Sequence, residues 1–196
     1  SSREWIRRYP CAYISMKDIY FTRHGQTFWN VENKICGATD IDLTPQGYAQ
    51  ARELGEKIKA EQLPIDLILY SPLSRAKHTA LEIAKITGIP AIEEPRLKEQ
   101  NFGRFESMPR HSEDFDEAKS HFVYSFDGGE TMLQLAQRIY NVLDDCKKRN
   151  ETVLLVAHNG ISRMVRSYFY NMSNEEFASY GIKNCEILKF TYPDEK

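Results

Sequence analysis

The sequence predicts an α/β protein with a largely parallel sheet. Three apolar runs, at residues 19–21, 66–70 and 153–157, have the length and composition of strands that are buried on both faces. Segments with helical spacing of apolar residues alternate with these runs, which is the pattern of an α/β fold. Ligands of such folds bind outside the carboxyl ends of the strands, so the residues that follow each run are the first candidates for a functional site.

Local signals support the expected helices and a last strand. Thr44-Pro45 offers a capping hydroxyl and a proline at the first helical position, and Gly88 with Pro90 ends the next helix. A strong amphipathic helix is expected over 132–149, another after His158, and a capping box predicts a short helix from residue 173. Residues 185–192 alternate like an edge strand, whereas residues 26–43 are expected to form a loop.

The length of 196 residues predicts one domain, which we expect to span residues 16–196. Residues 1–15 are basic and contain no long apolar segment, and Met16 comes just before the first strand. We therefore expect residues 1–15 to be an appendage whose deletion leaves folding and activity intact. The polar residues 106–127 are interpreted as a lid-like insertion.

The composition argues against several classes of protein. Lys and Arg total 26, Asp and Glu total 28, and the net charge of −2 provides no basic field for nucleic acid. No apolar run reaches the roughly 18 residues of a membrane span. The four cysteines are scattered without a C-x-x-C pair, so we expect no metal site and free thiols in a cytoplasmic protein.

Basic residues and imidazoles follow all three predicted strands. The first strand leads into Arg23-His24-Gly25, the second comes just before Arg75, and the third ends at His158. Taken singly, each residue is more often a surface ion-pair partner or a structural histidine. Parallel strands bring all three groups to one edge of the sheet, where two arginines, two imidazoles and two helix N-termini make a site for a phosphate dianion.

The motifs around these residues resemble those of the histidine phosphatase superfamily, also called the phosphoglycerate mutase-like family. They are RHG-x-T-x-x-N at 23–30, SPL-x-RA followed by TA at 71–80, L-x-E-x-x-FG-x-FE at 97–106, GET at 129–131 and HNG at 158–160. The resemblance spans about residues 17–191 in the family's order, and it implies a three-layer α/β/α sandwich. Ser107 departs from the glycine that the family often has there, which leaves the local loop geometry open.

The resemblance also implies a covalent mechanism without metal or cofactor. His24 is expected to attack phosphorus and become a phosphohistidine, and the adjacent arginines favour its neutral form. Arg23 and Arg75 hold the phosphoryl oxygens, and His158 stabilises the charge of the transition state. Glu99 protonates the leaving alkoxide and then activates water.

Two further residues are expected to bind substrate, and the reaction itself has alternatives. Asn30 and the backbone of Asn159 are candidate donors to the phosphoryl group. A phosphomonoester hydrolase is favoured over a bisphosphoglycerate-dependent phosphoglycerate mutase, because the chain is compact after Glu99, where mutases have a longer insertion. An inactive phospholigand-binding module is the third reading. The expected partner is a small phosphorylated metabolite, and we expect neither nucleic acid nor a membrane as a partner. The protein is expected to be a monomer or a homodimer. The sequence does not predict which phosphate ester is the substrate.

Overall fold

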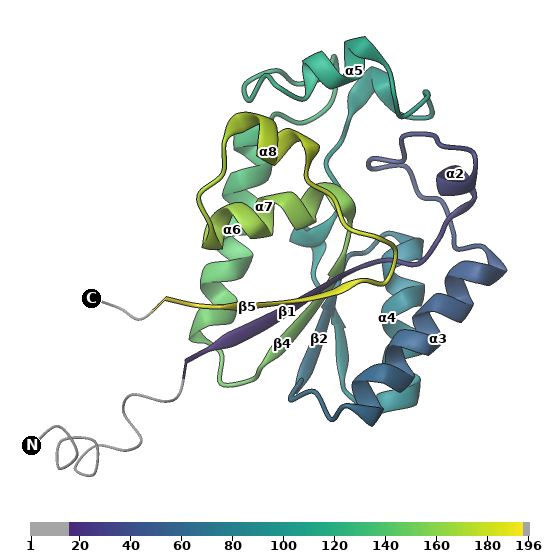
Figure 1. Ribbon diagram of the computed structural model, residues 1–196, viewed down its shortest axis with the longest axis vertical. Coiled ribbons are helices and arrows are strands. Elements are labelled where there is room, and N and C mark those ends of the chain that lie inside the picture. The colour runs from purple at the N-terminus through teal and green to yellow at the C-terminus, as the bar shows by residue number, and fades with distance from the viewer. Residues whose placement is uncertain (1–15, 194–196) are drawn as a thin grey trace, which may run out of the picture.

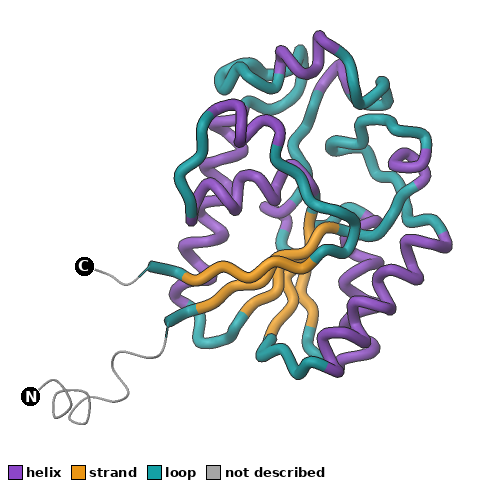
Figure 2. The backbone as a smooth tube through the Cα atoms, viewed as in Figure 1, coloured by secondary structure: helices purple, strands orange, loops and turns teal. Residues whose placement is uncertain are grey.

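A five-stranded sheet forms the centre of the molecule. The computed structural model describes residues 16–193, so the expected appendage at residues 1–15 lies outside the described residues. The strands are β1 (Asp18–Arg23), β2 (Leu67–Tyr70), β3 (Ala91–Glu93), β4 (Val153–Ala157) and β5 (Ile187–Thr191). Their order is β3-β2-β4-β1-β5, and β5 is antiparallel to β1 while the other described pairs are parallel. Figure 2 shows the strands in orange, with helices on either side of them. The predicted, largely parallel sheet is confirmed.

Helices cover both faces of the sheet, which confirms the three-layer sandwich. α3 (Pro45–Ala60) and α4 (Ser74–Thr87) pack on one face, and α6 (Met132–Lys148) and α7 (Asn159–Phe169) pack on the other (Figure 1). The short α8 (Asn174–Ser179) follows α7. Among residues 16–193 there is no helix whose length and apolar character would let it cross a membrane.

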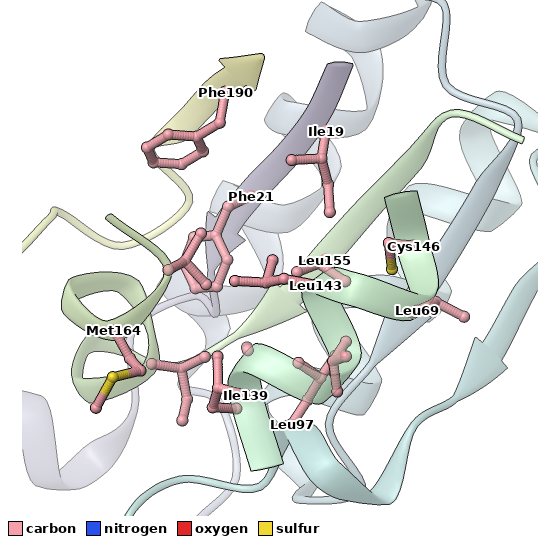
Figure 3. Packing of buried hydrophobic residues seen from close by; sticks show 14 of the residues in the cluster. Ile19, Phe21, Leu69, Leu97, Ile139, Leu143, Cys146, Leu155, Met164 and Phe190 are labelled. Atoms are coloured by element: carbon pink, nitrogen blue, oxygen red, sulfur yellow. The ribbon is translucent and has the colours of Figure 1, made fainter. Parts of the chain in front are cut away.

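The apolar strands divide their side chains between the two faces. In β1, Ile19 and Phe21 join the core under α6 and α7, whereas Tyr20 joins the core under α3 and α4. In β4, Leu155 joins the α6 side and Leu154 the α3 side, as the two-residue period of a strand requires. Figure 3 shows the first of these cores, where Phe21 and Leu155 meet side chains of α6. Burial on both faces explains why the strands contain so few polar residues.

Several short helices, turns and a strand were not predicted from the sequence. The segment expected to be a loop contains the four-residue helix α2 (Phe28–Val31), which Thr27 caps through its side chain. β3 has only three residues and two of them are exposed, so it carries no strand pattern. The 3₁₀ turns η1 (Pro95–Leu97) and η2 (Gly103–Phe105) and the helix α5 (Glu113–Ala118) are likewise too short for a periodic signal.

Residues 106–127, which we expect to be an insertion and call the insertion below, contribute to an apolar cluster separate from the cores that flank the sheet. Phe115 and Phe126 of the insertion pack with Phe102 and Phe105, and the ring centroids of Phe102 and Phe126 are 5.4 Å apart, edge to face. Ser107, at the start of the insertion, has a φ of +69° and donates its N–H to the carbonyl of Ile35. The loop therefore keeps a backbone conformation that favours glycine, although serine occupies the position.

Candidate active site

The predicted convergence of strand ends is present. β1, β2 and β4 run parallel, and β4 pairs directly with both of the others. A cleft lies at their carboxyl ends, and the residues that line it include Arg23, His24, Arg75 and Glu99. The ring centroid of His158 is 5.4 Å from that of His24. The five residues expected to be catalytic are thus brought together by the sheet and by the N-terminal ends of α4 and α7.

His24 is held in one orientation by its own backbone neighbourhood. Its backbone N–H donates to the Ala157 carbonyl, which ties the residue to β4, and its carbonyl accepts from the Asn184 side chain over 3.0 Å. The ring Nδ1 is 2.6 Å from the carbonyl of Gly25 and must be the donor, because a carbonyl only accepts. The neutral ring therefore has its lone pair on Nε2, the nitrogen available for attack on phosphorus.

Gly25, the residue after His24, is closely packed against α3 and α4. A Cβ on Gly25 would lie 2.4 Å from the carbonyl oxygen of Gly47 in α3. The Gly25 N–H also donates to the Thr79 hydroxyl of α4 over 3.0 Å. Gly25 is therefore needed so that the backbone after β1 can pack between α3 and α4.

The two arginines are fixed by backbone carbonyls. Arg75 is almost fully buried, and its two terminal nitrogens donate to the carbonyls of Thr39 and Gly37, each over 2.6 Å. Arg23 donates one terminal nitrogen to the carbonyl of Ile182 over 2.8 Å. Because carbonyls supply no negative charge, neither guanidinium is neutralised by these contacts.

His158 is oriented by Ser71, at the end of β2. Its Nε2 is 2.6 Å from the Ser71 hydroxyl, whose oxygen also accepts the Leu73 backbone N–H over 3.3 Å. The hydroxyl proton has no other acceptor among the described residues, so Ser71 donates to Nε2. A neutral His158 then carries its own proton on Nδ1, where it can be donated to an acceptor.

Unpartnered buried nitrogens gather around this cleft. Within residues 16–193 five buried side-chain nitrogens have no hydrogen-bond partner: Nε of Arg23, Arg75, Arg163 and Arg166, and Nδ1 of His158. Three of the four arginines line the cleft. An unsatisfied buried donor costs about 1–3 kcal/mol, so such a concentration is typical of a site where a ligand supplies the acceptors.

Glu99 faces the same cleft and is bound by backbone donors. One carboxylate oxygen accepts the Gln100 N–H over 2.8 Å, and the other accepts the Gly160 N–H over 3.0 Å. A Cβ on Gly160 would lie 2.5 Å from a Glu99 oxygen, so only glycine permits this contact. The start of α7 thereby holds the carboxylate in the cleft that Arg23, His24 and Arg75 also line.

The two asparagines expected to bind substrate both line the cleft. The Asn30 side-chain oxygen accepts the Thr27 N–H as part of the α2 cap, which leaves its amide NH₂ for a ligand. The Asn159 side-chain oxygen accepts the N–H of Ile182 over 2.9 Å. Asn159 is the first residue of α7, and His158 makes no side-chain cap there, so its backbone N–H suits an anion.

Charge and burial keep both imidazoles neutral. Burial, followed by the guanidinium groups of Arg75 and Arg23, holds the pKa of His24 well below its ordinary value of 6.5. Burial and Arg75 lower the pKa of His158 in the same direction. Burial and the charge of Arg110 lower the pKa of Arg23 to about 10, which still leaves it charged at neutral pH. The site is thus positively charged, and the two imidazoles within it are uncharged.

Sequence reasoning assigned no role to several residues that build the site. Glu106 accepts the backbone N–H groups of Ala38 and Thr39, and so supports the loop whose carbonyls hold Arg75. Ser71 and Glu106 both belong to the quoted motifs, which is a signal that pointed to them without giving their role. Asn184 lies after α8, outside every motif.

Four further cations line the cleft, namely Lys34, Arg110, Lys119 and Arg163, and no sequence pattern marked them. Neither His111 nor His121 is among the residues that line it. His78 pairs with Asp42 on the surface of α4.

A family model and curated relatives match nearly the whole described chain. The model described as "Histidine phosphatase superfamily (branch 1)" matches residues 19–196. Phosphoserine phosphatase 1 of Hydrogenobacter thermophilus is 32% identical over 180 residues, which cover 87% of this chain and 84% of the relative. A protein named probable phosphoglycerate mutase GpmB, from Enterobacter sp., is 32% identical over 190 residues, with coverage of 91% and 86%.

Solved structures agree with this assignment. Phosphoserine phosphatase of Entamoeba histolytica, in complex with 3-phosphoglyceric acid, superposes with a TM-score of 0.76 at 28% identity and covers 89% of this chain and 90% of its own. A mycobacterial glucosyl-3-phosphoglycerate phosphatase shares the fold, with a TM-score of 0.76 at 21% identity and coverage of 89% and 90%. The chain belongs to the histidine phosphatase superfamily.

Proposed function

We propose that the chain is a metal-independent phosphomonoester hydrolase that acts on a small phosphorylated metabolite through a phosphohistidine at His24. The observation that carries this proposal is the set of unpartnered buried donors on Arg23, Arg75 and His158 around the free Nε2 of His24. A phosphoryl group supplies acceptors to these donors and an electrophile to the nitrogen at the same place.

In the first half-reaction, Nε2 of His24 forms a bond to phosphorus and the ester P–O bond breaks. Arg23, Arg75 and Nδ1–H of His158 stabilise the charge on the equatorial oxygens. Protonated Glu99 gives its proton to the leaving alkoxide. In the second half-reaction, Glu99 takes a proton from water, the water oxygen bonds to phosphorus, and the P–N bond breaks to release phosphate and neutral His24.

The direct test is phosphate release from a panel of phosphomonoesters that includes phosphoserine and 3-phosphoglycerate, the compounds in the names of the relatives. We expect release by the wild-type chain and its loss in His24→Ala. Full activity in that variant would overturn the mechanism. A wild-type chain that binds phosphate but hydrolyses no ester would favour the phospholigand-binding module.

A phosphoglycerate mutase is the second candidate, because relatives with 28–32% identity are named probable phosphoglycerate mutases. A mutase keeps the phosphohistidine away from water and returns the phosphoryl group to the product. A mutase assay with 3-phosphoglycerate beside the panel separates the two. Isomerisation without net phosphate release would replace the hydrolase assignment.

We further propose that the enzyme is cytoplasmic and works as a monomer or homodimer, without nucleic acid or membrane as a partner. The three cysteines in the described part of the chain, Cys36, Cys146 and Cys185, are free thiols, which fits a reducing compartment. Light scattering on the purified chain reads the oligomeric state directly.

A further inference from the structure

More positive charge lines the cleft than a phosphoryl group needs. Besides Arg23 and Arg75, the lining includes Lys34, Arg110, Lys119 and Arg163, whereas Glu99 is the one carboxylate among the residues lining it. Lys34 is paired with Glu32 over 2.6 Å. Three cations of the lining remain after Arg23, Arg75 and Lys34 are set aside. We call these three, Arg110, Lys119 and Arg163, the outer cations.

Arg163 is the most constrained of the outer cations. It lies on α7, one turn after Asn159, and only 7% of its surface is exposed. Its guanidinium donates to the carbonyl of Ala178 over 3.1 Å, and Nε has no partner among residues 16–193. A buried guanidinium with a carbonyl but no bound carboxylate is costly, so this position suits an arrangement in which a ligand supplies the negative charge.

Arg110 and Lys119 come from the insertion and face the same space. Arg110 is attached to the α2 loop, because its backbone N–H donates to the carbonyl of Asn33 over 2.9 Å. No carboxylate in the described part of the chain forms an ion pair with Arg110. Lys119 ends α5, which lies beyond the carboxyl end of the sheet in Figure 1, and its ammonium is 3.5 Å from a mostly exposed Asp116 oxygen.

The outer cations are close enough to repel one another. Burial and then the charge of Arg163 lower the pKa of Lys119, with a smaller contribution from Arg110, while Asp116 acts in the opposite direction. Burial and the charge of Arg110 lower the pKa of Arg163, while Glu99 acts in the opposite direction. Mutual repulsion among the outer cations is an energetic cost of placing them around one cleft. Such a cost is offset when an anion binds between them.

We propose that the outer cations form a subsite for a second anionic group, a carboxylate or a second phosphate, on the leaving-group side of the substrate. The inference rests on the proposed function and narrows its substrate class to phosphomonoesters that carry such a group. The inner pair, Arg23 and Arg75, takes the phosphoryl group beside His24. The outer cations then hold the opposite end of the molecule and orient the ester oxygen toward Glu99.

Matched esters test this subsite. 3-Phosphoglycerate and glycerol 3-phosphate differ by one carboxylate, as do phosphoserine and phosphoethanolamine, while fructose 1,6-bisphosphate and fructose 6-phosphate differ by one phosphate. We expect the wild-type kcat/KM to favour the member with the second anion by about tenfold or more. The pair with the larger ratio tells whether a carboxylate or a phosphate is the group recognised. Ratios near one in all three pairs would overturn the proposal.

Single substitutions connect the preference to the residues. In Arg110→Gln and Lys119→Gln the ratio is expected to fall about tenfold, chiefly through KM. Arg104→Gln is the matched control, because Arg104 is on the adjacent turn η2, pairs with Asp127 and does not line the cleft. If neither cation variant changes the ratio, or if Arg104→Gln lowers it equally, the subsite is wrong. Arg163→Lys preserves the charge at a buried position where Gln risks misfolding.

A binding measurement separates failure of the subsite from failure of the proposed function. Calorimetry with 3-phosphoglycerate and glycerol 3-phosphate needs no turnover, and His24→Ala removes any hydrolysis during the titration. If no ester is hydrolysed by the wild type, the proposed function fails, but tighter binding of 3-phosphoglycerate that Arg110→Gln abolishes still supports the subsite. Equal binding of the two compounds would contradict it.

Discussion

The carboxyl end of the sheet and the insertion at residues 106–127 contribute to one cleft by different means. At the sheet, parallel strands place Arg23, His24 and the neighbours of His158 at fixed positions, and buried apolar residues on both faces hold them there. The insertion depends on a small cluster around Phe126 and on irregular backbone. The reacting groups are therefore on the rigid part of the fold, and the groups expected to select the leaving group are on the part with its own small core.

The largest effect is expected at the sheet end, from Glu99→Gln. Without a proton donor, kcat for alkyl phosphates should fall by about 10²–10⁴-fold. An aryl ester such as p-nitrophenyl phosphate has a good leaving group, so its first step should survive and give a burst of nitrophenol followed by slow turnover. Stopped-flow absorbance measures both phases. Glu113→Gln, at an exposed position of α5, is the control. Equal losses on both classes of ester, with no burst, would contradict the role of Glu99.

Phe126→Ala tests whether the insertion is a separate unit. The side chain is fully buried among Phe102, Phe105 and Phe115, so truncation should cost the cluster about 3–5 kcal/mol. We expect faster hydrogen exchange of amides over 106–127 and little change in β4. KM for the preferred ester should rise while inorganic phosphate still binds. If hydrogen exchange increased equally in β4, the sheet and the insertion would unfold as one cooperative unit, which would contradict their separation.

The buried imidazoles make the sheet end sensitive to acid. The unfolded chain protonates its histidines near pH 6.5, whereas the folded pKa values of His24 and His158 lie well below that. Below pH 6.5 the unfolded state therefore binds more protons than the folded state. As the pH is lowered, the free energy of unfolding should decrease by up to about 1.4 kcal/mol per pH unit for each of the two histidines. Urea denaturation between about pH 7 and 5 measures this slope. His24→Asn should reduce it, and the exposed His111→Asn should not; equal slopes in both variants would contradict the buried neutral state.

The smallest effect is expected from Ser71→Ala, because Ser71 acts through His158. Loss of one hydrogen bond should lower kcat/KM about tenfold. The specific readout is ¹⁵N NMR of the histidines, in which His158 should change from a ring protonated on Nδ1 to a mixture of tautomers. Ser71→Thr, which keeps the hydroxyl, should restore the signal. An unchanged His158 spectrum in Ser71→Ala would leave Ser71 without a positioning role.

The difference between the sheet and the insertion also explains which parts of the site could be predicted from the sequence. Strands with continuous apolar runs have a strong signal, and parallel pairing then places Arg23, Arg75 and His158 at one edge without any knowledge of the loops. Glu99 lies in an aperiodic segment, and only the motif resemblance assigned it a role. Its contact with the Gly160 N–H joins segments far apart in the chain, which no local pattern encodes.

The structure of the insertion and the positions of its cations could not be predicted from the sequence, for a physical reason. Its helix α5 has six residues, and Arg110 and Lys119 are separated along the chain without helical or strand spacing. Their proximity to Arg163 depends on packing of the cluster around Phe126 and on the backbone contact between Arg110 and Asn33. A charge in an irregular segment has no periodicity that predicts whether it faces the cleft or the solvent.

The central claim is that His24 carries the phosphoryl group between the two half-reactions. The most direct measurement mixes Glu99→Gln with p-nitrophenyl phosphate, stops the reaction with alkali during the burst, and locates the phosphoryl group by mass spectrometry of the peptides. The account predicts one phosphoryl group on the imidazole of His24, in an amount equal to the nitrophenol burst, and none in His24→Ala. A phosphoryl group on another residue, or a burst with no phosphorylated peptide, would contradict it.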